Sequence, residues 1–184
     1  MIRFISLSSG SAGNCYFLGN EERGILIDAG VSLRYMKKAF LNVGLDYDSF
    51  NSVLVTHDHM DHIRNLGSYC KRIMKAVYAT PTLLAARTMA SDHVRACARP
   101  LEEGKWNEID GFMVRFFVVP HDATQTVGYA SPNAEVLKEM SEGDYADNEA
   151  YLPRSGWAND EMFHDNRTLQ TKLAELWIKV KAEK

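Results

Sequence analysis

The sequence predicts a mixed α/β fold, because strand-like and helix-like patterns alternate along it. The run at 52–55 is short, apolar and β-branched, as in a buried strand. Residues 33–43 place apolar side chains at helical spacing, and residues 106–119 read as two strands joined by an Asp-Gly turn. With 184 residues, the chain is long enough for one domain with its own core.

The remaining strands are short and bounded by small or polar residues. Residues 2–7 read as a first strand, and residues 15–18, 24–27 and 77–79 read as further strands. Between the first two, the small residues at 8–14 allow a tight backbone turn. That turn is a plain hairpin connection or it lines a ligand cleft, and the two interpretations are compatible.

Helices are predicted where a capping side chain precedes helical apolar spacing. Ser32 can cap the helix over 33–43, which Gly44 ends. Thr80, followed by proline, starts another helix. A further helix begins near Asp61, and its spacing predicts a buried stripe of Ile63, Leu66, Tyr69, Cys70, Ile73 and Met74.

The composition is that of an ordinary soluble globular protein, with 46% hydrophobic and 24% charged residues. A net charge of −3 gives no global attraction to nucleic acid or to a membrane. The cysteines Cys15, Cys70 and Cys97 are odd in number and form no C-x-x-C pair, which indicates reduced thiols and a cytoplasmic protein. No stretch approaches a membrane span or a signal segment, so no membrane partner is expected.

The most distinctive stretch is 56–62, Thr-His-Asp-His-Met-Asp-His, directly after a predicted buried strand. Neutral imidazole is the commonest protein ligand for zinc, and a carboxylate supplies charge for a second cation. His57 and His59 are two residues apart, so they project the same way from extended backbone. Asp61 and His62 follow one turn later and can face a second metal position next to the first. The stretch predicts two adjacent metal ions; a polar loop with chance histidines is the alternative.

Other polar side chains also stand where predicted strands end. His121 follows Pro120 and suits either a metal ligand or a structural histidine. Asp122 either accepts from an imidazole N–H or bonds the turn backbone. Asp28 ends a strand and either satisfies loop N–H groups or orients metal ligands from behind. His93 lacks any partner spacing, so it is expected at the surface.

Several stretches together resemble the metallo-β-lactamase superfamily of metal-dependent hydrolases. They are the H-x-H-x-D-H motif at 57–62 and residues 3–16, 25–30, 120–124 and 127–129. The resemblance covers about residues 1–130 and is closest to the bacterial WalJ (YycJ) type, which are DNA exonucleases. It implies a metallo-β-lactamase-like αββα sandwich, of which the chain has only the N-terminal half, plus an unrelated or fused helical tail at 131–184.

The resemblance also implies roles for the candidate residues. His57, His59 and His121 would bind the first metal, while Asp61 and His62 would begin the second. Asp28 and Asp122 would support these ligands from behind, and Asp61 would be catalytic by orienting the nucleophile. The implied cofactor is one zinc ion or two, with manganese as the alternative. Water activated by the metal would attack phosphorus in DNA or in another phosphodiester.

The resemblance ends near residue 130. In the family, a bridging Asp and a further His from the second half complete the second site, and no such motif follows Tyr129. Residues 168–184 read as an amphipathic helix, and 131–184 are similar to the C-terminal end of periplasmic polyamine-binding proteins, which predicts a fused or truncated chain. Asp160, Glu161, His164 and Asp165 could replace lost ligands, although their spacing does not argue for it.

Two functions follow from these observations. The first is a metal-dependent hydrolase, a phosphodiesterase or DNA exonuclease. The second is a non-catalytic relic that binds at most one ion. A lactamase or thioester hydrolase is a third option, because a fold does not fix a substrate. An uncovered sheet face would be shielded either by the tail or by a second copy in a homo-oligomer.

Overall fold

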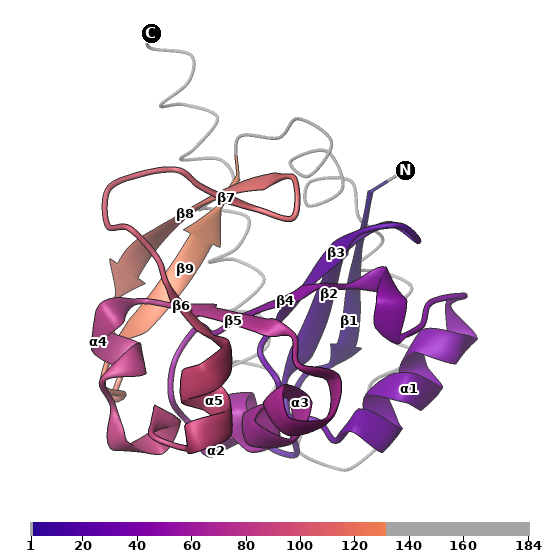
Figure 1. Ribbon diagram of the computed structural model, residues 1–184, viewed down its shortest axis with the longest axis horizontal. Helices are drawn as coiled ribbons and strands as arrows, with labels where there is room; N and C mark the ends of the chain where they lie inside the picture. Colours follow the sequence, from indigo (N-terminus) through magenta and orange to yellow (C-terminus); the bar gives the residue numbers. More distant parts are fainter. Residues whose placement is uncertain (1, 132–184) are drawn as a thin grey trace, which may run out of the picture. The chain divides into compact units, whose positions relative to one another are not determined.

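The computed structural model describes residues 2–131. This part of the chain contains two β-sheets with helices packed on the first (Figure 1). The first sheet has the strand order β1-β2-β3-β4-β5-β6, with bounds Arg3–Ser8, Cys15–Gly19, Gly24–Ile27, Ser52–Leu54, Ala76–Ala79 and Ala98–Pro100. The second has the order β7-β8-β9, with bounds Asn107–Ile109, Phe112–Val119 and Thr126–Ala130.

Strand direction in the first sheet decides where polar loops gather. Strands β1 to β3 are antiparallel neighbours, whereas β3 to β6 run parallel to one another. The carboxyl ends of β3, β4 and β5 therefore meet at one edge. Asp28 follows β3, the histidine motif follows β4, and Thr80 follows β5. In parallel sheets this edge is where ligands bind.

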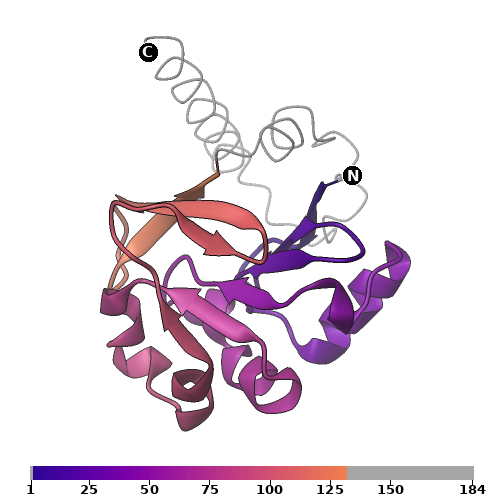
Figure 2. The same cartoon turned by 45° about the horizontal axis from the view of Figure 1, so that its top comes forward.

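The helices lie on the face of the first sheet that is turned away from the second sheet (Figure 2). They are α1 Leu33–Asn42, α2 Met60–Ile63, α3 Leu66–Ile73, α4 Pro81–Leu84 and α5 Asp92–Cys97, with single 3₁₀ turns η1 Tyr47–Ser49 and η2 Arg87–Met89. The predicted caps are confirmed: Ser32 Oγ accepts from the Tyr35 N–H at 3.2 Å, and Thr80 Oγ1 accepts from the Leu83 N–H at 3.2 Å.

The prediction of a single helix after Asp61 with a buried stripe up to Met74 is wrong in two respects. It is divided into α2 and α3, because the Asn65 N–H bonds Ala29 O at 3.1 Å instead of continuing the helical ladder. Met74 is 79% exposed instead of buried. It adopts the left-handed conformation, with φ 50°, at the end of α3, and so lies beyond the stripe that the helical spacing predicted.

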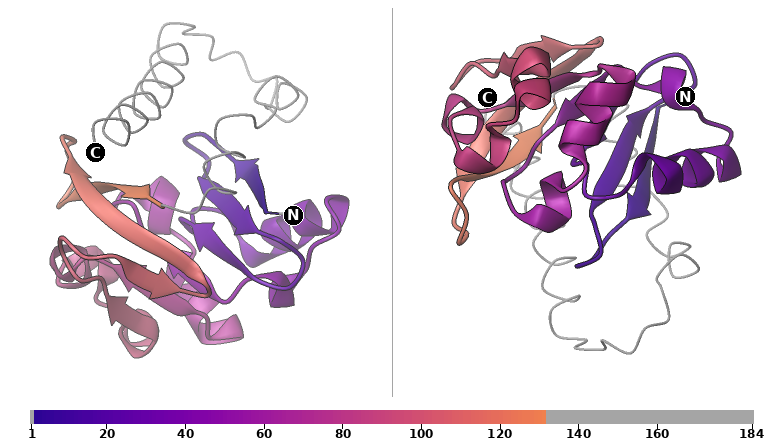
Figure 3. Two further views of the ribbon diagram at one scale, coloured as in Figure 1. Left: turned by 90° about the horizontal axis from the view of Figure 1, so that it is seen from above. Right: turned by 60° about the horizontal axis from the view of Figure 1, so that its bottom comes forward.

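Two apolar clusters join three layers. Between helices and first sheet, Phe40 makes edge-to-face contacts with Phe17 and Phe50 at centroid distances of 5.5 and 5.9 Å. A second cluster includes Leu54 of the first sheet and Phe112 of the second, and Figure 3 shows the strands of both sheets from two further sides. Helices, sheet and sheet are three successive layers of the predicted αββα sandwich. The predicted tail at 131–184, with its amphipathic helix and its four polar ligand candidates, lies outside the described residues apart from Ser131.

The second sheet contains one confirmed and one unexpected element. The predicted hairpin is confirmed, and its turn residues Asp110 and Gly111 take φ values of 51° and 80°. Strand β9 was not predicted, because Gly128 interrupts its strand pattern. The Phe117 ring on β8 lies over that glycine, and a Cβ there would require the ring to move. Of the helices in residues 2–131, none is both long and apolar enough to cross a membrane.

Candidate metal centre

Three histidines converge at the carboxyl edge of the first sheet. His57 and His59 belong to the segment after β4, and His121 follows β8 of the second sheet. One ring nitrogen from each lies within 4.8 Å of the others, and the ring centroids are 4.7 to 5.0 Å apart. The structure thus brings together two histidines that the motif holds close in sequence and a third from another sheet.

Hydrogen bonds from behind fix which ring nitrogen of His57 carries a proton. The Thr56 hydroxyl donates to Asp28 Oδ2 at 2.8 Å, so its oxygen accepts from His57 Nδ1 at 2.9 Å. His57 Nε2 is then left with its lone pair. Asp28 is 1% exposed and also accepts from the Thr56 N–H at 2.8 Å. Asp28, which was expected to orient metal ligands from behind, thus bonds Thr56 and reaches His57 through it.

The other two imidazoles are oriented by Asp122. His59 Nε2 lies 3.2 Å from Asp122 O, which can only accept, so the lone pair of His59 is on Nδ1. His121 Nδ1 lies 3.2 Å from Asp122 Oδ1. The Asp122 side chain is 84% exposed, so solvent weakens its contacts with these imidazoles. Its contact with an imidazole is one of the two alternatives that the sequence left open.

The environment of His57 favours the neutral ring. Burial, reinforced by the neighbouring His62 imidazole, lowers the pKa of His57 to about 4, although the Asp28 charge acts in the opposite direction. The ring is therefore uncharged at neutral pH. Neutral imidazole is the form that coordinates a metal ion.

Asp61 and His62 lie side by side but form a separate pair. Asp61 Oδ2 is 3.5 Å from His62 Nε2, and His62 Nδ1 is 2.6 Å from Asp28 Oδ2. The Asn14 side-chain amide lies at 2.8 Å from Asp61 Oδ2 and 3.0 Å from His62 Nε2. Within residues 2–131, the three-histidine group is the one set of three or more His, Cys, Asp or Glu side chains that could share an ion, and this pair is not part of it.

Sequence reasoning missed three residues at this edge: Asn14, Thr56 and Asp58. Asn14 ends the small-residue turn, whose cleft-lining interpretation already placed it near a ligand. Thr56 and Asp58 belong to the histidine motif, yet nothing in their spacing distinguishes them from ordinary loop residues. Burial raises the pKa of Asp58, but hydrogen bonds from Thr124 and Thr88 outweigh it, so that pKa lies below its usual value.

Close backbone contact holds the two loops of the site together. The Ala29 N–H bonds His62 O at 2.7 Å, and the Asn14 N–H bonds Asp61 O at 2.7 Å. Gly30 lies directly between them, and a Cβ there would overlap both Asp61 O and the Asn14 nitrogen. Only glycine allows this approach.

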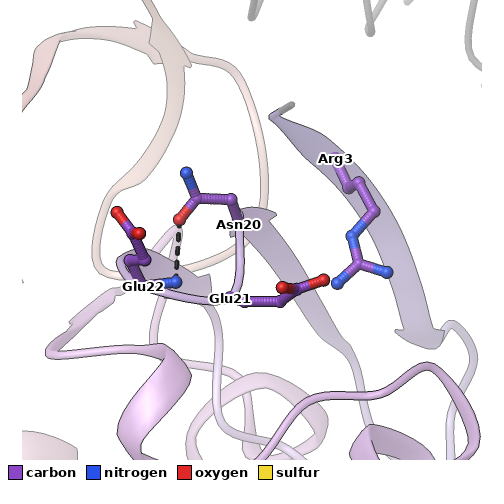
Figure 4. A pocket seen from close by; sticks show the side chains of 4 residues that line it. All are labelled: Arg3, Asn20, Glu21 and Glu22. Carbon is purple, nitrogen blue, oxygen red and sulfur yellow. Dashed lines mark hydrogen bonds between the residues drawn. The ribbon is translucent and has the colours of Figure 1, made fainter.

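A hollow elsewhere on the molecule is not part of this centre. It has a volume of about 320 Å³ and is lined by Arg3, Asn20, Glu21 and Glu22 (Figure 4). The pairing of Arg3 with Gly19 puts it at the edge of the sheet opposite to the histidines. None of its lining residues is a predicted site residue.

A comparison of the sequence with known families decides the assignment. The sequence model of the metallo-beta-lactamase superfamily matches residues 9–131. The chain belongs to this superfamily. The fold implies divalent metal binding, and the donors fit: three imidazoles converge, and the hydrogen bonds described above leave a ring nitrogen of each unused.

Two curated proteins are similar in sequence to this chain over part of its length. Exodeoxyribonuclease YycJ of Bacillus anthracis is 30% identical over 133 residues, which are 72% of this chain and 50% of the relative. Exodeoxyribonuclease WalJ of Streptococcus pneumoniae serotype 2 (strain D39 / NCTC 7466) is 26% identical over 124 residues, 66% of this chain and 46% of the relative. The chain thus spans about half the length of the curated relatives it matches.

Solved metallo-β-lactamases share the fold at low sequence identity. SMB-1 in complex with mercaptoacetic acid gives a TM-score of 0.56 at 17% identity, covering 69% of this chain and 54% of that chain. The Rm3 metallo-β-lactamase gives 0.54 at 18% identity, covering 66% and 51%. The predicted sandwich class is confirmed by these structures, and at such identities they carry no information on substrate.

Proposed function

We propose that this chain is a metal-dependent phosphodiesterase that acts on DNA and binds zinc through His57, His59 and His121. The observation that carries the proposal is the convergence of three imidazole nitrogens within 4.8 Å of one another at a sheet edge. Three-histidine sets with an open position are typical of catalytic zinc. The hydrolase class is supported by superfamily membership.

The residues around the ligands have defined tasks. A bound divalent cation supplies positive charge that lowers the pKa of water and offsets charge developing on a phosphoryl oxygen. Asp28 holds protons on Nδ1 of His62 directly and of His57 through Thr56, so that both Nε2 atoms keep their lone pairs. Ligands held in one tautomer and orientation bind metal more tightly.

Asp61 and His62 are proposed to hold a second cation, zinc or manganese. Their ligand atoms are 3.5 Å apart, and the Asp61 side chain is 31% exposed, so solvent reaches it. We infer that Asp61 orients the attacking water, with Asp122 and Asp28 in supporting positions. None of these residues is proposed to act as a general acid for the leaving group.

DNA is the proposed substrate because the two curated relatives are named exodeoxyribonucleases. Since the net charge of the chain is −3, attraction to the phosphate backbone would come from bound cations and local basic side chains. A cytoplasmic location is proposed because the three cysteines, Cys15, Cys70 and Cys97, are all buried and free. Homo-oligomer formation stays a prediction.

The proposal is tested by metal analysis and a nuclease assay on the full chain. Purified protein loaded with zinc or manganese is incubated with end-labelled duplex and single-stranded DNA. Progressive shortening from an end is expected, together with its loss in His59→Ala. His93→Ala is the matched control, because His93 is exposed on α5 and outside the site. Equal activity in His59→Ala and the parent would refute the assignment.

A second candidate is a protein that binds one ion and does not catalyse. It is favoured by the Asn14 amide, which bonds both Asp61 and His62 where a second ion would sit. Metal stoichiometry separates the two candidates. Two ions per chain support the hydrolase, whereas one ion with no turnover supports the non-catalytic protein. Hydrolysis of a β-lactam without cleavage of DNA would refute the proposed substrate.

A further inference from the structure

Asp58 stands between His57 and His59 in the chain, but its carboxylate bonds elsewhere. Oδ1 accepts from the Thr124 N–H at 3.1 Å, and Oδ2 accepts from the Thr124 hydroxyl at 2.6 Å. Oδ2 also accepts from the Thr88 hydroxyl at 2.9 Å. Asp58 is only 8% exposed, so these bonds compensate a buried charge. One side chain thus joins the histidine loop, the η2 turn and the loop between β8 and β9.

The loop between β8 and β9 is the one that carries His121. It spans residues 120–125, and Thr124 lies three residues after His121. The His121 side chain is 43% exposed, so packing alone does not hold it. His59 also contacts Asp122, and a hydrogen bond joins Thr80 to Gln125. The His121 ring contacts the His57 and His59 rings, and directly after the loop the Val127 N–H bonds Thr56 O at 2.9 Å. Asp58 provides three of the bonds that hold this region, two of them to the loop itself.

We propose that Asp58 is a positioning residue that fastens the 120–125 loop to the histidine loop and so places the His121 imidazole beside His57 and His59. The expected effect on metal binding rests on the proposed function. The expected effect on the 120–125 loop concerns the metal-free chain alone. Asp58 touches no ligand atom and acts through Thr124 and the backbone of the loop.

Two measurements test the proposal on the full chain. The first is hydrogen exchange of the metal-free protein. In Asp58→Ala the amides of residues 121–126 are expected to exchange at least about 10-fold faster, because the loop loses its anchor while the helices keep theirs. Asp92→Ala is the matched control, since that carboxylate is 99% exposed and lies on α5. Unchanged exchange at 121–126, or a uniform increase along the chain, would overturn the proposal.

The second measurement is a double-mutant cycle of zinc affinity, by competition with a chromogenic chelator. Asp58→Ala is expected to weaken binding about 10- to 100-fold, as is typical when a group behind a ligand is lost. In a His121→Ala background the same change should have little further effect, because the imidazole that it positions is already gone. An equal loss in both backgrounds would indicate general destabilisation and refute positioning.

Conservative variants keep the proposal testable if Asp58→Ala does not fold. Asp58→Asn retains an acceptor for the Thr124 N–H, so it should recover part of the zinc affinity. Thr124→Val removes only the hydroxyl bond and should give a smaller loss in the same direction. Parent protein that binds no zinc would refute the proposed function. Faster exchange at 121–126 in Asp58→Asn would then still support the anchor, and unchanged exchange would refute it.

Discussion

The two groups of ligand-type residues at the sheet edge are built in opposite ways. His57 and His59 follow a strand of one sheet, and His121, more than 60 residues later, follows a strand of the other, yet their ring nitrogens converge. Asp61 and His62 are neighbours in one short helix, yet the Asn14 amide bonds both of them. Closeness in sequence therefore does not make ligands available. Availability depends on what the rest of the fold places between them.

The two groups nevertheless share one support. Asp28 reaches His57 through Thr56 and reaches His62 directly at 2.6 Å. Its φ of 64° lies in the left-handed region, which Asp and Asn tolerate better than most residues. One buried carboxylate thus orients an imidazole in each group. Substitution of a residue that belongs to one group, or of the carboxylate that both groups share, tests whether the groups act separately.

The largest effect is expected from removing one ligand of each group. His121→Ala should weaken binding of the first zinc by more than about 100-fold, beyond what loss of a supporting group costs, because one of three donors is gone. His62→Ala should leave that affinity within a few-fold. Calorimetric titration with zinc measures both. Similar losses in the two variants would show that the groups are not separate.

Asp28→Asn should damage both groups. Asparagine can keep the left-handed backbone conformation of Asp28. Its side-chain NH₂ group would, however, face another donor, from Thr56 or His62, where the carboxylate oxygen now accepts. We expect the free energy of unfolding, measured in urea with a chelator present, to fall by about 2 kcal/mol. Zinc affinity should fall at both positions. Asp48→Asn, exposed on η1, is the control. A loss of binding at one position alone would contradict a shared support.

Asn14→Ala should affect the Asp61–His62 pair and the turn at Gly10, and leave the three-histidine group in place. Without metal, loss of its amide bonds should lower the free energy of unfolding by about 1 kcal/mol. With saturating zinc the difference from the parent should narrow, because an ion no longer competes with the amide for these ligands. Chemical denaturation with and without zinc measures this. A gap that widens with zinc would mean that the amide assists binding.

The smallest effect concerns the thiol next to Asn14. Burial, and then the Asp28 charge, raises the pKa of Cys15 far above its usual value, and burial raises the pKa of Cys70 to about 12. Both thiols should therefore react with an aromatic disulfide reagent at pH 8 only as fast as the chain opens. Asp28→Asn should speed this reaction modestly through its lower stability. A thiol that reacts at the rate of free cysteine would contradict the burial.

The sequence predicted what depends on local patterns. Helix caps at Ser32 and Thr80 and the Asp-Gly hairpin are set by neighbouring residues, so they were predictable. The division between α2 and α3 was not, because Asn65 takes its partner from a loop more than 30 residues away. For the same reason β9 was missed, since Gly128 reads as a break until Phe117 is seen to cover it.

At the site, residue types were predictable and relationships were not. The sequence alone singled out the histidines and Asp61 at 57–62 and His121 as candidates, by their chemistry and by the family resemblance. The tasks of Thr56, Asp58 and Asn14 depend on partners that only the folded chain brings near. Such hydrogen bonds leave no period or spacing in the sequence.

Two carbonyl oxygens of the short helix α2 accept hydrogen bonds from other segments of the chain. Asp61 O and His62 O bond the N–H groups of Asn14 and Ala29. These two bonds join α2 to the turn that ends at Asn14 and to the loop after β3 through main-chain atoms, which substitution of side chains leaves in place. By contrast, Ser9, Ser11 and Ala12 lie exposed in the turn that precedes Asn14. Their side chains can therefore be exchanged without removing either main-chain bond.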